Sequence, residues 1–321
     1  MEPKAIVTIP PYAPFIDEVL RHEIVSGIRL NTVMPVKDSL EDVLKRLDEK
    51  ARRYSKELWV DLKCRQLRVK SYGVPPFTEI ELTHNIQVNT PVTAYFSDGK
   101  EVATVLAVEG NKLIMQEGPK RVVGPGESVN IPHHSLAVDG YFTDTDKRYI
   151  EAGNKIGMHN YMISFVEGQE DIEALYKLDP QAVPIAKIES RKGMDYVAGD
   201  WDGKTRLMAA RGDLFVELRL PHHIIGALET IVQKDPNAVV ASRIFNSLAY
   251  SPEPSCEDIA DADNLLRMGY RTLMLGDDVC MRHDSVISSL NLLDALAGKY
   301  RADNSKVLIV KKSVLVDGGS K

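Results

Sequence analysis

Short apolar runs alternate with amphipathic stretches along most of this chain, and this alternation predicts a β/α architecture. Apolar runs of about four to eight residues are typical of buried strands, and apolar residues recurring every three or four positions are typical of helices. The predicted strands are residues 5–9, 28–32, 57–63, 160–166, 183–189, 205–214, 238–245 and 270–278. The predicted helices are residues 15–27, 39–55, 144–157, 168–180, 192–202, 220–236, 256–269 and 285–300. A strand-then-helix pattern repeated eight times predicts an α/β fold, a TIM (β/α)8 barrel, whose chemistry lies at the carboxyl ends of its strands.

Residues 68–141 interrupt this alternation and are named here the β insert. They contain short β-rich runs separated by turn signals, at 79–84, 91–99, 103–110, 112–118 and 127–132, and no convincing helix. We therefore expect two domains: a catalytic barrel formed by residues 1–67 and 142–321, and a small β-barrel lid inserted after the third strand. A further strand is expected in the tail at 306–321.

Charged residues follow two of the predicted strands directly. The run "VPIAKIES" ends in Lys187 and Glu189, and "RLMAARGDL" ends in Arg211 and Asp213. Such strands deliver their charges to the rim of the sheet. Two carboxylates give hard oxygen ligands for a divalent cation, and a lysine beside them suits an anionic, oxygen-rich substrate.

Composition narrows the functional class. The chain has 321 residues, 44% hydrophobic content and a formal net charge of −6, which is ordinary for a globular enzyme and gives no global basic field for nucleic acid. The three cysteines lack metal-ligand or disulfide spacing, so we expect a reducing, cytoplasmic location. No run approaches the length of a membrane span or a signal peptide, so we expect no membrane partner.

Taken in order, these segments resemble the pyruvate kinase family. The resemblance rests on "KAIVTIPP" (4–11), "GIRLNT" (27–32), "VDLKCRQLR" (60–68), "SFV" (164–166), "AKIES" (186–190), "MAARGDL" (208–214), "VVASRIFNSL" (239–248) and "PEPSCEDIADADNLL" (252–266). It extends over nearly the whole chain and stops before that family's C-terminal domain. It implies a short, divergent member that transfers a phosphoryl group between phosphoenolpyruvate and ADP through an enolpyruvate intermediate.

The resemblance also implies roles for individual residues. Catalytic roles fall to Lys187, Arg29 and Ser242, and contacts with the substrate carboxylate to Arg211, Gly212 and Asp213. Glu189 and Asp213 would bind Mg²⁺ or Mn²⁺, and Asn31 and Asp61 match ligands of a monovalent-cation site. Lys63, Arg68 and Asp98 match the nucleotide side.

Several positions depart from the family pattern. Val33 replaces a ligating serine, and valine cannot bind K⁺, which counts against K⁺ as a cofactor. Gln66 replaces an acidic residue, and Thr145 stands where a nucleotide-contacting lysine is expected. Arg243 replaces a glutamine, and "GDDV" (276–279) replaces "SGET". The residues that match the family's metal and enolate positions therefore depart less from the family pattern than those that match its nucleotide positions.

Three hypotheses follow. The first is phosphoryl transfer between phosphoenolpyruvate and ADP. The second is metal–enolate chemistry on a 2-oxo acid without a nucleotide: decarboxylation, carbon–carbon cleavage or tautomerisation. The third is a non-catalytic relative that binds a metabolite or protein. The expected partners are a small phosphorylated or 2-oxo acid, with ADP or ATP in the first case, and a homo-oligomer could form through the barrel.

Overall fold

Eight parallel strands close into a barrel, as the sequence predicted. The computed structural model describes residues 2–73, 79–218 and 220–301. Around the barrel the strands follow the order β1-β15-β14-β13-β12-β11-β3-β2. Their bounds are β1 Lys4–Thr8, β2 Val25–Asn31, β3 Glu57–Leu62, β11 Asn160–Ile163, β12 Val183–Ile188, β13 Arg206–Ala210, β14 Val239–Ala241 and β15 Thr272–Leu275.

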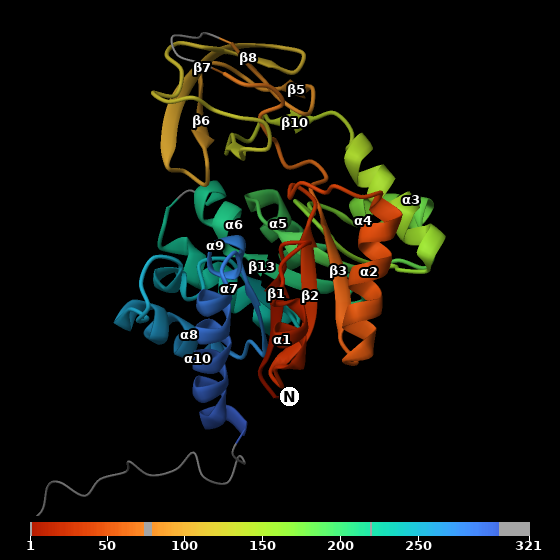
Figure 1. Ribbon diagram of the computed structural model, residues 1–321. Coiled ribbons are helices and arrows are strands. Elements are labelled where there is room, and N and C mark those ends of the chain that lie inside the picture. The colour runs from red at the N-terminus through yellow and green to blue at the C-terminus, as the bar shows by residue number, and fades with distance from the viewer. Residues whose placement is uncertain (1, 74–78, 219, 302–321) are drawn as a thin grey trace, which may run out of the picture.

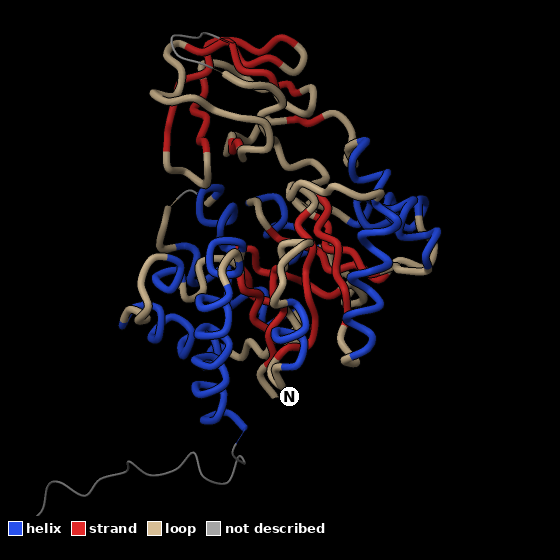
Figure 2. Tube along the Cα trace, in the orientation of Figure 1, coloured by secondary structure: helices blue, strands red, loops and turns tan. Residues whose placement is uncertain are grey.

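Helices surround this barrel on its outside (Figures 1 and 2). They are α1 Ile16–Arg21, α2 Leu40–Arg53, α3 Asp144–Ile156, α4 Gln169–Leu178, α5 Arg191–Gly199, α6 Arg211–Glu217, α7 His223–Lys234, α8 Cys256–Met268, α9 Asp277–Cys280 and α10 His283–Arg301, with a 3₁₀ turn η1 at Asn246–Ala249. Helix α2 is capped at its N-terminus, because the Ser39 hydroxyl accepts a hydrogen bond from the Asp42 amide at 3.1 Å.

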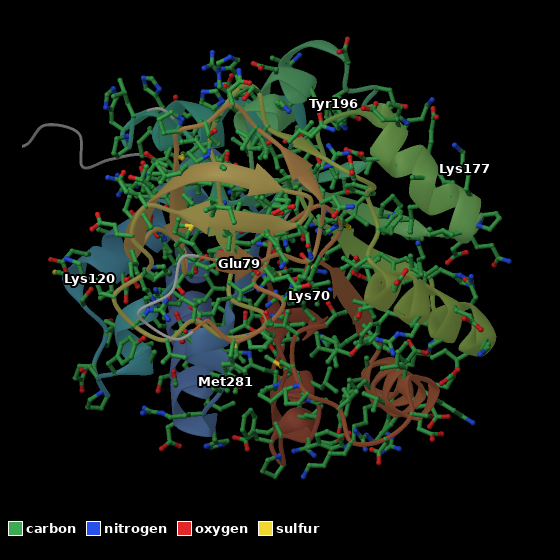
Figure 3. All side chains as sticks on the ribbon, turned by 90° about the horizontal axis from the view of Figure 1, so that it is seen from above. Lys70, Glu79, Lys120, Lys177, Tyr196 and Met281 are labelled. Atoms are coloured by element: carbon green, nitrogen blue, oxygen red, sulfur yellow. The ribbon has the colours of Figure 1, made fainter. Side chains whose placement is uncertain are left out.

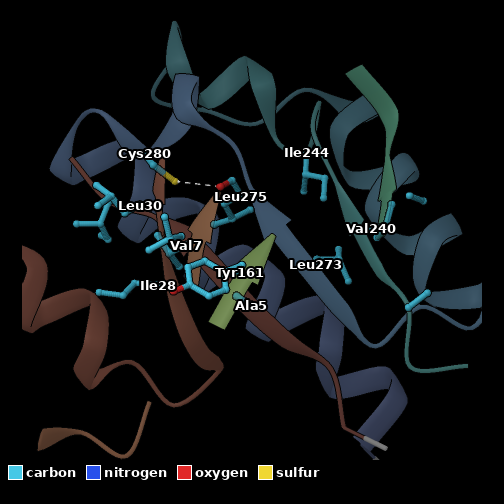
Figure 4. Close-up of a cluster of buried hydrophobic side chains, with 14 of the residues drawn as sticks. Ala5, Val7, Ile28, Leu30, Tyr161, Val240, Ile244, Leu273, Leu275 and Cys280 are labelled. Atoms are coloured by element: carbon cyan, nitrogen blue, oxygen red, sulfur yellow. Dashed lines mark hydrogen bonds between the residues drawn. The ribbon is translucent and has the colours of Figure 1, made fainter. Parts of the chain in front are cut away.

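Two apolar layers hold the barrel together. The larger layer lies between the strands and the surrounding helices; Figure 4 shows part of it, with Val7, Leu30 and Leu275 among its side chains. The smaller fills the barrel interior and consists of Ile6, Trp59, Met162, Ile185, Met208, Ala210, Val239, Ala241 and Met274. Burying one such Leu or Ile contributes about 1.5–3 kcal/mol, so these layers fix the strand positions on which the site depends.

Several predicted boundaries are wrong, and the strands predicted at 160–166 and 238–245 already end at Ile163 and Ala241. The helix predicted at 15–27 ends at Arg21, and the strand predicted at 28–32 already begins at Val25. The strand predicted at 205–214 ends at Ala210, and the strand predicted at 270–278 ends at Leu275. In the last two cases a new helix begins directly after the strand, so the apolar run spans two elements. An acidic residue in the first turn of each helix, Asp213 in α6 and Asp277 in α9, complements the helix dipole.

The β insert forms two sheets of its own between β3 and α3. Its strands are β4 Glu79–Glu81, β5 Ile86–Gln87, β6 Val92–Phe96, β7 Glu101–Glu109, β8 Lys112–Met115, β9 Val129–Asn130 and β10 Ala137–Val138. Strands β5 and β10 pair in a two-stranded sheet, and the other five are ordered β4-β8-β7-β6-β9 around a separate apolar cluster. Single bridges from Val69 to Leu82 and from Arg68 to Ser128 join the two edges, which gives the sheet a barrel-like closure.

The β insert lies over one end of the barrel. Figure 3 looks down from that side, and the insert, with Lys70 and Glu79, lies in front of the barrel. The insert follows β3, so it emerges at the carboxyl ends of the strands. Its domain limits and its role as a lid remain predictions.

Two further observations complete the fold. Along the described ranges, no helix is both long and apolar enough to cross a membrane. The strand predicted at 306–321 lies outside the described residues.

Candidate active site

The two-residue period of the strands places a polar layer directly above the apolar barrel interior. Ile6, Trp59, Met162 and Ile185 point inward, so the residues two positions later also point inward. Those residues are Thr8, Asp61, Ser164 and Lys187, and all four are buried. This layer lies at the carboxyl ends of the strands, where TIM barrels carry their chemistry.

Asp61 is the centre of this polar layer. Its side chain is fully buried and accepts hydrogen bonds from the Nε of Arg29 at 2.9 Å, the Nζ of Lys63 at 2.9 Å and the Nζ of Lys187 at 3.2 Å. Burial alone would raise the pKa of Asp61, but Arg29, Lys187 and Lys63 outweigh it and hold the pKa well below its usual range. Asp61 therefore stays ionised and holds three cationic side chains together.

Lys187 connects two parts of the site. Its ammonium donates to the Ser164 hydroxyl at 2.8 Å and lies 3.1 Å from Oε1 of Glu189. Burial would lower the pKa of Lys187, but the carboxylates of Asp61 and Glu189 raise it. Lys63 lacks a second close carboxylate, and burial lowers its pKa to about 8.

Glu189 and Asp213 lie on the other side of Lys187. The Phe165 amide donates to Oε2 of Glu189 at 2.8 Å. The two oxygens of Asp213 accept only neutral donors, the amides of Gln66 at 2.9 Å and Asn130 at 3.1 Å. Burial, followed by the negative charge of Glu189, raises the pKa of Asp213 to about 7.

Sequence reasoning missed Glu217 as a part of this group. Asn130 donates to Glu217 at 3.0 Å through the same amide that contacts Asp213. Burial raises the pKa of Glu217 to about 8, and the charge of Asp213 contributes. The spacing of four residues in "RGDLFVE" places both carboxyls on one face of α6, and this spacing was the available signal.

The donor set around Asp213 fits a divalent cation. Two carboxyls lie close enough to perturb each other, and Oδ1 of Asn130 is buried without a partner among the described atoms. Hard oxygen ligands of this kind are those that Mg²⁺ prefers. The described residues contain no group of three or more His, Cys, Asp or Glu side chains that could hold a metal, so the other ligands would come from a substrate or water.

The predicted nucleotide-side residues meet at the junction of barrel and insert. The Oε1 of Gln66 accepts from Nε of Arg68 at 3.1 Å and from its Nη2 at 2.6 Å, and the Nη1 of Arg68 donates to the Gly126 carbonyl. Asp98 accepts from the Ser128 hydroxyl at 3.0 Å. The donors of Arg68 are thus already engaged within the protein.

The segment Arg211–Asp213 was predicted to end a strand, but it forms the first turn of α6. The guanidinium of Arg211 points away from the cleft: it pairs with Asp261 at 2.8 Å and donates to the carbonyl of Ser242 at 2.8 and 3.0 Å. Arg211 thereby holds the turn after β14, where Ser242 and Arg243 have the positive φ angles 71° and 56°. Gly212 is a neighbour of Ser242, whose Oγ lies at an ordinary contact distance of 3.5 Å from the position a Cβ would take.

One contact with Arg29 and Asn31 was not predicted from the sequence. Asp277, the first residue of α9, accepts from Nη1 of Arg29 at 3.0 Å and from Nδ2 of Asn31 at 2.9 Å. Burial alone would raise the pKa of Asp277, but Arg29 and Asn31 lower it. The sequence marked "GDDV" only as a departure and gave no role to Asp277.

One cleft of about 870 Å³ gathers most of the predicted site residues. It is lined by Arg29, Asn31, Lys63, Arg68, Asp98, Lys187, Glu189, Gly212, Asp213 and Ser242. Asp61 lies beneath this surface, and Arg211 faces away from it. The arrangement can bind an acidic, oxygen-rich ligand between a cationic group and a pair of carboxylates.

Comparison with known proteins relates this chain to one enzyme family. Residues 77–282 match the family model "Pyruvate kinase, barrel domain". The chain is similar to the pyruvate kinase of Clostridium acetobutylicum, with 27% identity over 196 residues, 58% of this chain and 41% of the relative. It is 23% identical to the enzyme of Thermoplasma acidophilum over 309 residues (87% of this chain, 54% of the relative), and 23% identical to that of Borreliella burgdorferi over 323 residues (91% and 66%).

These relatives are longer than this chain, which spans about half of their length. The family-model match contains Lys187, Glu189, Asp213 and Ser242, whereas Arg29 and the other residues of the first three strands lie outside it. The family-model match therefore includes the barrel strands β11 to β15.

Proposed function

The chain belongs to the pyruvate kinase family, and on this premise we propose that it transfers a phosphoryl group between phosphoenolpyruvate and ADP. The observation that carries this proposal is the position of Lys187. Its ammonium lies 3.2 Å from Asp61 and 3.1 Å from Glu189, between the cationic group and the two carboxyls. A substrate with a phosphoryl group and a developing enolate needs positive charge at that point.

Each side chain has a defined part in this proposal. Lys187 stays protonated at neutral pH because its pKa is raised, so it can stabilise negative charge on the phosphoryl and enolate oxygens. Arg29, held by Asp61, would contact the transferring phosphoryl group. The Ser242 hydroxyl beside Gly212 would relay the proton that reaches the enolate carbon.

Glu189 and Asp213 would hold Mg²⁺ or Mn²⁺. When bound, this ion would neutralise charge on the phosphoryl group and on the enolate oxygen. The amides at the start of α6, around Gly212 and Asp213, lack helical partners and would bind the substrate carboxylate. Lys63, Arg68 and Asp98 would face the nucleotide, with Asn31 and Asp61 near a monovalent cation.

A specific contact favours a second function, enolate chemistry on a 2-oxo acid without a nucleotide. Gln66 accepts two hydrogen bonds from Arg68, and the Gly126 carbonyl accepts a third. A nucleotide phosphate would have to break these contacts to reach Arg68. A substrate without a nucleotide would leave them intact.

The experiment that separates these functions starts with a coupled pyruvate assay. The purified full chain is incubated with Mg²⁺, phosphoenolpyruvate and ADP, with and without K⁺. We expect ADP-dependent pyruvate formation, and Lys187→Met should reduce it about 10²–10³-fold, since removal of one preorganised electrostatic group has effects of that order. Lys204→Met is the control, because this side chain is 84% exposed on a loop and should leave the rate unchanged.

The alternative has its own readout. Metal-dependent exchange of the pyruvate methyl protons with D₂O, seen by proton NMR without phosphoryl transfer, would support the second function. If a folded chain showed neither activity, a non-catalytic binding protein would remain. Assembly through the barrel helices is a further expectation, which sedimentation can test.

A further inference from the structure

Asp277 occupies a position that a substrate anion would need. Its carboxylate accepts a hydrogen bond from Arg29 at 3.0 Å and another from Asn31 at 2.9 Å. Both donors lie at the carboxyl end of β2 and both line the cleft. The chain's own carboxylate therefore already engages both cleft-facing donors, Nη1 of Arg29 and Nδ2 of Asn31.

The charges within the ion-pair network that contains Asp277 are balanced. The three cationic side chains Arg29, Lys63 and Lys187 face three carboxylates, Asp61, Glu189 and Asp277. A phosphoryl group that reached Nη1 of Arg29 would bring two further negative charges close to Asp277. Like charges at hydrogen-bond distance repel strongly in a partly buried site, so both groups cannot occupy that position together.

Asp277 differs from Asp61 in how easily it can leave. The Asp61 side chain is fully buried, whereas that of Asp277 is 42% exposed. Asp277 begins a four-residue helix, and Gly276 before it has open space around its Cβ position. If Asp277 moved into solvent, Asp61 would still hold Arg29 in place through its Nε.

We propose that Asp277 is a specificity-determining residue that competes with the substrate phosphoryl group for Arg29 and Asn31. Binding of the phosphorylated acid then requires Asp277 to leave Arg29 and Asn31, whereas binding of the same acid without its phosphoryl group does not. This inference rests on the proposed function for the identity of the acids, phosphoenolpyruvate and pyruvate. It concerns only binding and needs no turnover.

The test compares two ligands and three variants by isothermal titration calorimetry of the full chain, with Mg²⁺ and without nucleotide. Asp277→Asn keeps the shape of the side chain and removes its charge, and Asp277→Ala removes the competing group. We expect both variants to bind phosphoenolpyruvate at least about tenfold more tightly, while the pyruvate Kd changes less than about twofold. Asp278→Asn removes the same charge from the next, exposed residue and should leave the ratio of the two Kd values unchanged.

Each other outcome overturns the inference. Equal gains for both acids would indicate general electrostatics, and unchanged phosphoenolpyruvate affinity would show that Asp277 does not compete. Absence of binding in wild type and both Asp277 variants would also contradict it, because the vacated donors should accept the phosphoryl group. The proposed function fails separately, through absent pyruvate formation, and that result leaves the ratio of affinities measurable.

Discussion

The two halves of the cleft handle charge in opposite ways. In the cationic half, Arg29, Lys63 and Lys187 surround carboxylates that belong to the protein, and the fully buried Asp61 is held ionised. In the carboxylate half, Asp213 and Glu217 share the neutral amide of Asn130, and their pKa values are raised to about 7 and 8.

This difference indicates how each half would respond to an incoming ion. The cationic half is complete without a ligand, so an incoming anion must replace an internal one. In the carboxylate half, Asp213 and Glu217 have no cationic hydrogen-bond partner among the described residues, so an incoming cation would relieve repulsion there. Lys187 joins the halves through its contacts with Asp61 and Glu189.

The largest expected effect comes from removing the centre of the cationic half. Asp61→Asn leaves three buried cations with less compensation, and we expect the free energy of unfolding to fall by about 3–5 kcal/mol. Urea denaturation at pH 7 measures it. Asp17→Asn, which breaks a partly exposed pair with Lys50, is the control and should cost about 1 kcal/mol or less. If Asp61→Asn lowered the free energy of unfolding no more than Asp17→Asn, the cationic half would not depend on Asp61.

The next effect concerns pH and the carboxylate half. Folded Glu217 has a raised pKa of about 8, against an ordinary value of 4.5, so the folded state holds a proton that the unfolded state has released. Stability should therefore fall as the pH rises from about 5 to 8 in metal-free buffer. Glu217→Gln should remove roughly 1–2 kcal/mol of this fall, after allowance for partial solvent contact.

Thermal unfolding at pH 5.5 and pH 8 checks this sign. Glu229→Gln, on the neighbouring helix α7, is a matched control and should keep the wild-type slope. If the stability of the wild type rose over this range while that of Glu217→Gln did not, the inference that Glu217 is protonated in the folded state would be wrong.

The smallest effect tests how the β insert acts on the barrel. Asp98 is one of the negative charges that raise the pKa of Asp213, after burial and Glu189. Asp98→Asn should lower the pKa of Asp213 by less than about one unit, measured by carbon-13 NMR of the carboxyl groups. Asp139→Asn, exposed at the other end of the insert, should cause no shift. Equal shifts in both variants would count against the insert lying over the site.

The sequence predicted those parts of the site that local pattern determines. Lys187 and Glu189 follow an apolar strand with a two-residue period, so their place at the barrel rim could be inferred directly. The eight strands and the inserted sheet were predicted for the same reason. By contrast, "RLMAARGDL" runs from β13 into α6 with no intervening loop, so its pattern did not reveal where β13 ends and α6 begins.

The rest depends on contacts between distant parts of the chain. Asp277 lies 248 positions from Arg29, and Asn130 lies 83 from Asp213. No local period links such residues, and only the closed barrel with the β insert over it brings them together. Arg211 shows the converse, because the resemblance implied a substrate contact there while its side chain pairs with Asp261.

The central claim is that the carboxylate half is built for a divalent cation, and Mn²⁺ binding tests it most directly. Electron paramagnetic resonance of free Mn²⁺ should show one ion bound per chain at pH 7.5. Glu189→Gln and Asp213→Asn should each weaken this binding at least about tenfold, since each removes one anionic ligand. Asp278→Asn, which changes charge at the cleft edge, should leave it within about twofold. Mn²⁺ binding that is absent in wild type, or equal in all four proteins, would contradict the account.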